Sequence, residues 1–360
     1  MKNHYTLTLA NRSMAILLGF LLLTIGTATA QKVNYSDSWS EQGFTMTRES
    51  TSGIELIYSV QEFTLSDIDI KGEAMKHLAM PGNFLPTDEG TPNLPGTGQY
   101  IAIPQGATVS YEITASRVES YTDVNLSPAP RIPKVTDEGP LVYNKNQKIY
   151  SRNAFYPSST VQVSEKRNIR GVDAVIIGIT PFQYNPVTKE LLVYRDLEVK
   201  VNFEGGSSQF GDNIHRNRWF EPILDDIFIN YSSLPKLDFN KHGSSANRGG
   251  NVDYIIITPD DAGFQAWADT IKVFRTRQGI STQCYTISEV GGNYASAIET
   301  FINEAYTNWN TVACLLIGDY GNDGAVGNVI TSPRWEFNGN PYCVSDNIYG
   351  DIDGDDLPDV

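Results

Sequence analysis

The stretch Asp253-Tyr-Ile-Ile-Ile-Thr258 begins the part of the chain whose pattern decides the fold. Its continuous apolar run predicts a buried strand, and the spacing of the apolar residues after it predicts a helix that ends near Gly279. A second strand over residues 282–287, a second helix over residues 294–305 and a third strand, Val312-Ala-Cys-Leu-Leu-Ile-Gly318, follow. Strands that alternate with helices in this way predict a parallel sheet with right-handed crossovers.

The carboxyl ends of these three strands are where a parallel sheet carries its ligand-binding and catalytic loops. In this chain those loops lie near Pro259, Glu289 and Asp319. Asn293, just before the second helix, is a candidate N-cap. The glycines of Gly318-Asp-Tyr-Gly321 match neither a dinucleotide-binding fingerprint nor a phosphate-binding loop with its lysine, so we expect no nucleotide cofactor.

Residues 43–205 have a different pattern, which is typical of β-structure. In Leu197-Glu-Val-Lys-Val-Asn-Phe-Glu204 apolar and polar residues alternate, and this predicts a strand with one buried and one wet face. The apolar run over residues 174–180 and the turn residues 184–189 predict a hairpin with this strand. Further strands are expected at residues 54–60, 100–103 and 109–114.

The junction between the two patterns predicts where the domains divide. Apolar residues over 219–229 have helical spacing, and the sequence leaves open whether this helix packs on the β-rich region or on the α/β region. Residues 239–251 are polar and Gly/Ser-rich, which is typical of a protease-accessible linker. We therefore predict a β-rich domain over 31–238, a linker over 239–251 that is cut after Arg248, and an α/β domain over 252–360.

Residues 1–30 have the pattern of a secretory signal. Lys2 and Arg12 supply the positive end, residues 14–25 form the apolar run, and Ala28-Thr-Ala30 is a small-residue cleavage site. We predict cleavage after Ala30 and export of the mature protein. No later stretch approaches the roughly 20 apolar residues that a membrane span needs, so no span is expected.

The charge of the chain argues against some classes of partner. The net charge is −15, and it becomes −17 when the signal is removed with its two basic residues. Nucleic acids and anionic lipids require clustered Lys and Arg, so neither is expected as a partner. The cysteines are Cys284, Cys314 and Cys343. Three cysteines cannot form a disulfide framework, but one disulfide between two of them remains possible in an oxidising compartment.

The acidic segment Asp351-Ile-Asp-Gly-Asp-Asp-Leu-Pro-Asp-Val360 predicts a cation site. Alternate carboxylates in a tight turn can converge on Ca²⁺, which takes about six to eight oxygen ligands. The candidate ligands are Asp351, Asp353, Asp355 and Asp359, and we expect a structural Ca²⁺. Asp356 stands where the calcium hand has glycine and no glutamate follows at the twelfth position, so a solvated acidic turn is the alternative.

The residues themselves show no catalytic set. The three histidines after the signal, His77, His215 and His242, all precede the α/β region, whereas a cysteine nucleophile needs a base beside it. Cys314 lies inside an apolar strand and is expected to be core, Cys284 is expected in a strand, and Cys343 in a loop. No G-x-S-x-G motif is present. We therefore assign no catalytic residue to this chain.

The order of several motifs resembles the gingipain-like secreted cysteine peptidases. In the α/β region these are residues 253–258, Phe274-Arg-Thr-Arg-Gln-Gly279, Leu315-Leu-Ile-Gly-Asp319 and Ser345-Asp-Asn-Ile-Tyr-Gly-Asp-Ile-Asp-Gly-Asp355. The β-rich region is similar to the propeptide of that family. The motifs that match there are Gly90-Thr-Pro-Asn-Leu-Pro95, Ile101-Ala-Ile-Pro-Gln-Gly106, Arg170-Gly171, Thr180-Pro-Phe-Gln-Tyr-Asn-Pro186 and Leu191–Tyr194.

The resemblance implies a β-rich propeptide domain followed by a caspase-like α/β domain, of which residues 252–360 are the first half, with the His-Cys dyad beyond Val360. It implies a secreted or cell-surface endopeptidase zymogen that acts on protein or peptide substrates and whose own propeptide is its intramolecular inhibitor. Two alternatives stay open: a non-catalytic calcium-binding surface protein on the same scaffold, and a secretion-system sortase or signal peptidase of the same family.

Overall fold

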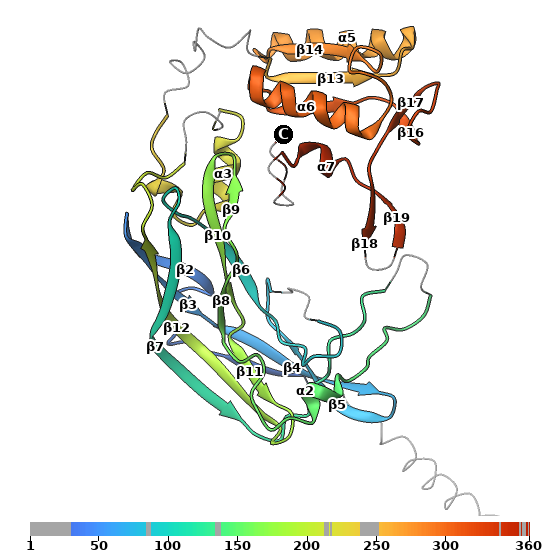
Figure 1. Cartoon of the computed structure of the whole chain (residues 1–360). Helices are drawn as coiled ribbons and strands as arrows, with labels where there is room; N and C mark the ends of the chain where they lie inside the picture. Colours follow the sequence, from blue (N-terminus) through green and yellow to red (C-terminus); the bar gives the residue numbers. More distant parts are fainter. Residues whose placement is uncertain are drawn as a thin grey trace, which may run out of the picture.

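The chain changes architecture between residues 237 and 252, as Figure 1 shows for the computed structural model. The structure describes residues 30–83, 88–133, 138–211, 216, 218–237, 252–337, 340–352, 354, 358 and 360. We call the described residues 30–237 the β-domain and the described residues 252–360 the α/β region. The β-rich first part and the parallel sheet of the second part confirm the predicted fold class.

Antiparallel strands in three sheets build the β-domain. One sheet has the order β1-β4-β5, the second has β6-β10-β8 with β9 also on β10, and the third has β11-β12-β3-β2 with β7 on the other edge of β12. The strands are β1 Gln31–Asn34, β2 Gly43–Ser50, β3 Gly53–Ser59, β4 Glu62–Ile70, β5 Glu73–Ala79, β6 Thr97–Ala102, β7 Thr108–Tyr121, β8 Val161–Val163, β9 Arg167–Ile169, β10 Val172–Ile179, β11 Phe182–Asn185 and β12 Glu190–Glu204. A short helix, α2 (Gln147–Tyr150), lies between β7 and β8.

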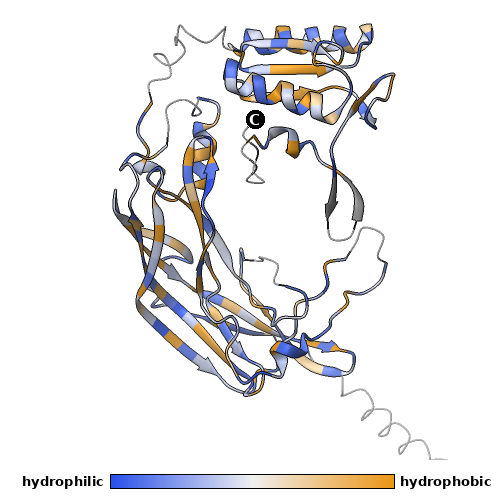
Figure 2. Cartoon of the chain, viewed as in Figure 1, coloured by the Kyte–Doolittle hydropathy of each residue, from blue (hydrophilic) through white to orange (hydrophobic). Residues whose placement is uncertain are grey.

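Strand β12 confirms the alternation predicted for residues 197–204. Leu197, Val199, Val201 and Phe203 are buried, and the residues between them are partly or fully exposed. The alternation of colours along the long strands in Figure 2 is the same pattern. The predicted hairpin partner was wrong, because β12 pairs with β11 across the turn at 185–190 while residues 174–179 belong to β10 in another sheet.

The helix predicted at residues 219–229 is α3 (Glu221–Ile227), and it packs on the β-domain. Leu224 and Phe228 are buried in the same apolar cluster as the strands. Asn230 fixes the chain after the helix, because its side chain accepts from the amide of Ala102 and donates to the carbonyl of Ala102, both at 2.9 Å. A 3₁₀ turn (η1, Tyr231–Ser233) follows. The core of the β-domain therefore settles the choice that the sequence left open.

The α/β region is built on three parallel strands with the order β14-β13-β15. β13 (Tyr254–Thr258) lies in the middle and is apolar along most of its length (Figure 2). Helix α5 (Ala262–Arg277) joins it to β14 (Thr282–Thr286), and α6 (Ala295–Trp309) joins β14 to β15 (Ala313–Leu316). The sheet lies between the two helices in Figure 1, as right-handed crossovers in opposite directions require.

Short elements follow β15 that the sequence did not predict. They are β16 (Asp319–Gly321), β17 (Val329–Thr331), β18 (Arg334–Phe337), β19 (Asn340–Val344) and α7 (Asn347–Gly350). β16 pairs with β17 in parallel, and β18 pairs with β19 as a hairpin. The backbone of Cys343 lies in β19 opposite Trp335, so the prediction that Cys343 is in a loop was wrong.

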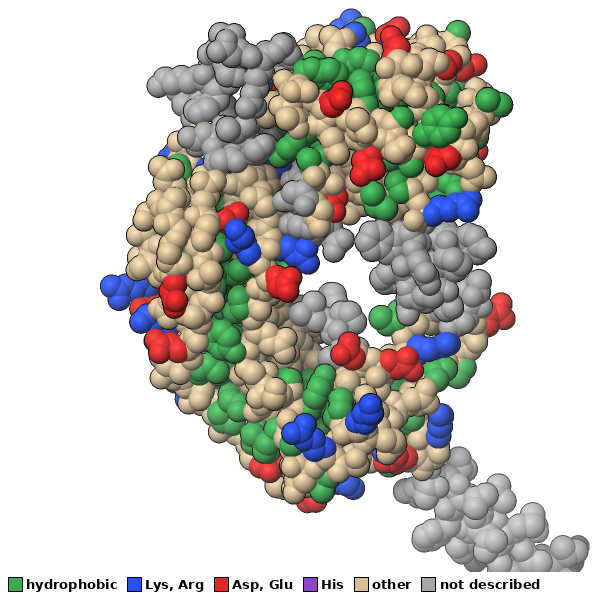
Figure 3. Space-filling model, viewed as in Figure 1, with side chains coloured by type: hydrophobic (Ala, Val, Ile, Leu, Met, Phe, Trp, Pro, Cys, Tyr) green, Lys and Arg blue, Asp and Glu red, His purple; other side chains and the backbone are tan. Residues whose placement is uncertain are grey.

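The charges of the described surface are mixed in sign. The face shown in Figure 3 has acidic and basic side chains next to one another over both regions. Among the described residues, no helix combines the length and the apolar character that crossing a bilayer would need.

Candidate functional site

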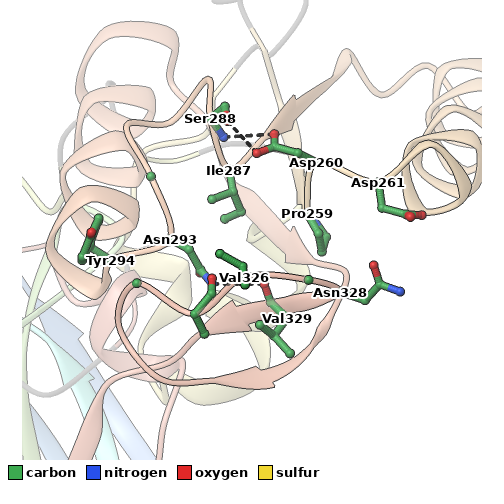
Figure 4. A pocket seen from close by; sticks show the side chains of 14 residues that line it. Pro259, Asp260, Asp261, Ile287, Ser288, Asn293, Tyr294, Val326, Asn328 and Val329 are labelled. Carbon is green, nitrogen blue, oxygen red and sulfur yellow. Dashed lines mark hydrogen bonds between the residues drawn. The ribbon is translucent and has the colours of Figure 1, made fainter.

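A pocket lies at the carboxyl ends of β13 and β14 (Figure 4), the edge at which a parallel sheet is expected to carry its site. Its volume is about 470 Å³. The loops predicted from the sequence form part of this pocket. Pro259 lines it, and so does Ser288, the residue before Glu289. Asp319 does not line it but holds the facing loop, because its amide donates to the carbonyl of Asn328. The lining residues are Pro259, Asp260, Asp261, Ile287, Ser288, Gly292, Asn293, Tyr294 and 324–329.

A carboxylate and a hydroxyl meet at one wall of this pocket. The hydroxyl of Ser288 donates to Oδ2 of Asp260 at 2.5 Å, and the amide of Ser288 donates to Oδ1 at 3.2 Å. These bonds favour the charged carboxylate, and the hydroxyl bond is the main reason why the pKa of Asp260 lies below its ordinary value. Asp260 is thus an anchored anion, and because its pKa lies below the ordinary value it is a weak base for the Ser288 hydroxyl.

Asn293 fixes the opposite wall instead of capping α6, so its predicted role as N-cap was wrong. Its side-chain oxygen accepts from the amide of Thr331 at 2.8 Å, and its nitrogen donates to the carbonyls of Ala325 and Val329. The N-cap position belongs to Tyr294, and the first-turn amide of Ala295 is satisfied by Oδ1 of Asp323 at 2.9 Å. Only the fold brings residues 323–331 to this helix, so local sequence rules could not reveal the arrangement.

The described cysteines do not form a thiolate site. Cys284 and Cys314 are free and half-buried. Burial raises the pKa of both thiols, that of Cys314 to about 12, and in Cys314 the charge of Asp346 acts in the same direction. Ile256 pairs with Cys284 and Ile255 with Cys314, so the two thiols are on opposite faces of the sheet and cannot join in a disulfide. The side chain of Cys343 lies outside the described residues.

The histidines show no partnership with these thiols where the structure describes them. His77 is in β5, opposite Ser66 of β4, within the β-domain. His215 and His242 lie outside the described residues. Among the residues that line the pocket there is neither a histidine nor a cysteine. The pocket can therefore bind and orient a ligand, but its lining offers no histidine–cysteine pair for covalent catalysis.

One of the four predicted calcium ligands, Asp351, is within the described residues. It is half-buried, and its Oδ1 accepts from the amide of Gly354 at 2.8 Å, which closes a tight turn. The amide of Val360 donates to the carbonyl of Gly350 at 3.3 Å, so the two ends of the acidic segment meet. Asp353, Asp355 and Asp359 lie outside the described residues. Among the residues that the structure describes, no group of acidic, His or Cys side chains is placed to hold a metal ion. The calcium site stays a prediction.

The two predicted processing sites differ in what the structure describes. Ala30 is exposed and directly precedes β1. Arg248 lies outside the described residues. Both cleavages stay predictions.

Comparison with known proteins gives two adjacent family matches. The Propeptide_C25 model matches residues 44–237, and the model of peptidase family C25 matches residues 247–360. Gingipain R2 of Porphyromonas gingivalis is 24% identical over 279 residues, which are 75% of this chain and 35% of that protein. Lys-gingipain HG66 of the same species is 23% identical over 363 residues, 97% of this chain and 20% of that protein.

This chain therefore spans between a fifth and about a third of the length of these curated relatives. Two solved structures are also similar. A complex of the pro- and mature domains of RgpB from P. gingivalis has a TM-score of 0.45 at 21% identity, covering 52% of this chain and 97% of that one. A structure that addresses the zymogenic latency of gingipain K has a TM-score of 0.42 at 26% identity, covering 49% of this chain and 100% of that one.

Proposed function

The chain belongs to peptidase family C25, and from this premise we propose that it is the precursor of a secreted cysteine-type endopeptidase whose β-domain is the propeptide. The order of the two family matches carries the proposal. The propeptide match ends at residue 237 and the peptidase match begins at residue 247, which is where the antiparallel sheets give way to the parallel one. A propeptide joined to its enzyme in this order is the arrangement of a zymogen.

The proposal gives this chain no catalytic residue. The only described histidine is in the β-domain, and burial raises the pKa of both described thiols. The His-Cys dyad of the family is expected in sequence after Val360. In the α/β region the role of the described residues is to hold the carboxyl-end edge in shape, through Asn293 and through the Asp260–Ser288 pair. Protein or peptide substrates would bind at that edge, and the β-domain would act as the intramolecular inhibitor.

Maturation would proceed by two cuts. The first removes the signal after Ala30 and sends the protein out of the cell or to its surface. The second, after Arg248, separates the propeptide over 31–238 from the peptidase domain that begins at residue 252. The polar, Gly-rich composition of residues 239–251 supports this position, since a protease needs several extended residues without apolar anchoring.

A structural Ca²⁺ in the acidic loop belongs to the same proposal. Asp351, Asp353, Asp355 and Asp359 would supply carboxylate oxygens, which are the ligands that Ca²⁺ prefers. The contact between Gly350 and Val360 supports the fit, because it closes the segment into one loop. Gly354, which stands between the second and third of these aspartates in the sequence, has a φ of 79°, a left-handed conformation that lets the backbone turn there.

The test is to purify the mature secreted protein, sequence its N-terminus and assay casein cleavage with and without iodoacetamide. We expect a start directly after Arg248 and cleavage that the thiol reagent abolishes. The purified chain 31–360 is the matched control and is expected to be inactive, because burial raises the pKa of its described thiols and the only described histidine is in the β-domain. Activity that resists thiol blocking, or a mature protein that still begins at residue 31, would contradict the proposed zymogen.

A further inference from the structure

Two arginine side chains of the β-domain reach the α/β region at one edge of its parallel sheet. Nη2 of Arg170 donates to the main-chain carbonyl of Val312 at 3.0 Å, and Nη2 of Arg218 donates to that of Gly279 at 2.7 Å. Gly279 precedes β14 and Val312 precedes β15. Both arginines therefore meet the amino ends of the strands, whereas the pocket lies at the carboxyl ends.

The amino-end edge is also where the helices of a parallel α/β unit end. α5 ends at Arg277 and α6 at Trp309, and the chain leaves each helix through a left-handed residue, Gly279 (φ 81°) and Asn310 (φ 59°). The last carbonyls of a helix lack partners within the helix and carry partial negative charge. A guanidinium near each of these exits places a complementary charge there, and it donates to a carbonyl that follows the helix, that of Gly279 or Val312, rather than to a carbonyl of the helix itself.

Arg170 is held in position by the β-domain. It is in the turn between β9 and β10 with a φ of 52°, and the amide of the next residue, Gly171, donates to Oδ1 of Asn168 at 2.9 Å. Its guanidinium lies 3.4 Å from the ring centroid of Phe220, at the start of α3. Arg170 is only 4% exposed. Arginine is seldom buried this deeply unless its charge is paired or hydrogen-bonded, so the bond to Val312 is a specific one.

A third arginine of this segment, Arg216, does not contact the α/β region in this way. It is buried as well, but Nε and Nη2 donate to the carboxylate of Glu221 at 2.8 and 2.6 Å, and Nη1 donates to the carbonyl of Pro235. These contacts lie within the β-domain and brace α3. Arg218, only two residues later, is exposed, stacks on Trp219 and contacts the end of α5.

We propose that Arg170, Arg218 and Phe220, which we call the arginine patch, dock the β-domain on the helix-exit edge of the α/β region and keep the two parts together after the linker is cut. The acceptors are backbone carbonyls, so the docking depends on the fold of the α/β region rather than on particular side chains there. The carboxyl-end edge stays clear of these contacts. Docking and inhibition are then separate tasks of the β-domain, and the docking does not depend on the chain being a peptidase.

The experiment places a recognition site for a sequence-specific protease within residues 238–251 of chain 31–360. After cutting, the dissociation rate of the two fragments is measured by size-exclusion chromatography at successive times after dilution. We expect the wild-type fragments to elute together. Arg170→Ala should speed dissociation by roughly ten- to a hundredfold, the value of one hydrogen bond to a charged group. Arg218→Glu should speed it by about two- to tenfold, because Arg218 is exposed and its bond is worth less. Arg48→Ala is the matched control and should behave as wild type, since Arg48 is exposed on β2 and pairs with Glu55.

The exposed Arg218 keeps the test decisive if Arg170→Ala impairs folding of the β-domain. Circular dichroism of each cut protein reports whether both parts are still folded. Wild-type fragments that separate at once on cutting would overturn the proposal. A folded Arg218→Glu protein whose fragments dissociate at the wild-type rate would also overturn it, because the patch would then contribute nothing to docking.

Discussion

The β-domain and the α/β region bury their apolar residues in different ways. The β-domain closes three sheets around one cluster, in which Tyr58, Phe63, Phe182 and Tyr184 are fully buried. The cluster of the α/β region lies mainly on the α6 side of its sheet, with Ile298 and Ile302 against Ile255 and Ile257. The β-domain thus has one core shared by its three sheets, and the α/β region has a core concentrated on one face.

The second face of the parallel sheet shows what this difference means. Of helix α5 only Ala268 is buried, whereas Trp267 is 68% exposed and Phe274 is 58% exposed. Burial of apolar surface is the main source of stability. The α/β region therefore gains less stabilisation per residue from its core than the β-domain does. The β-domain can therefore stabilise itself, while the α/β region gains from contacts made to its edges and loops.

The largest expected effect follows from the shared core of the β-domain. Leu197→Ala in β12 removes a fully buried side chain, so the free energy of unfolding of the β-domain should fall by about 2–5 kcal/mol. Urea unfolding measures the loss, and hydrogen exchange of the β13 amides shows whether the α/β region is affected. Val118→Ala on the exposed side of β7 is the control and should change stability by less than about 0.5 kcal/mol. An equal loss of protection in β13 would mean that the two regions unfold as one unit.

A smaller effect is expected from calcium, and it should be confined to the α/β region. A ligand that binds only the folded state adds about 2.7 kcal/mol at a concentration of 100 Kd, so Ca²⁺ should raise the Tm of this region. The double variant Asp353→Ala, Asp355→Ala should lose the response. The control is the double variant Asp225→Ala, Asp226→Ala on α3. It removes the same charge elsewhere in the chain and should keep the response to Ca²⁺. Equal Tm shifts in both double variants would show that the acidic loop is merely solvated.

The smallest expected effect tests the wall of the pocket. The hydrogen bond from Ser288 lowers the pKa of Asp260, so its contribution is present above the unfolded pKa of about 3.9 and is lost as the pH falls through the folded value. Ser288→Ala should therefore destabilise the α/β region at pH 6, by less than about 1 kcal/mol because the pair is exposed. The difference should disappear toward pH 2. Denaturation curves at both pH values measure it, and a difference that grows at low pH would contradict the assignment.

Much of the architecture was predictable because it rests on short-range patterns. The alternation in residues 197–204 and the apolar run of β13 each predicted the correct element, and the order of strands and helices predicted the parallel sheet. The partner of β12 was mispredicted because a turn shows that the chain reverses but not which of two apolar runs is close enough to pair. The N-cap of α6 was mispredicted because Asp323, from a distant loop, satisfies the helix in place of Asn293.

The sequence by itself determined the two-part plan, the family and the candidate acidic loop, since each depends on residue types at fixed spacing. Only the tertiary structure decided which groups meet. Ser288 and Asp260 come together because β13 and β14 are neighbours in the sheet, and Arg170 reaches Val312 because the β-domain docks where the helices end. The physical reason is that hydrogen bonds act over about 3 Å, so any contact between residues far apart in the chain exists only once the fold has placed them.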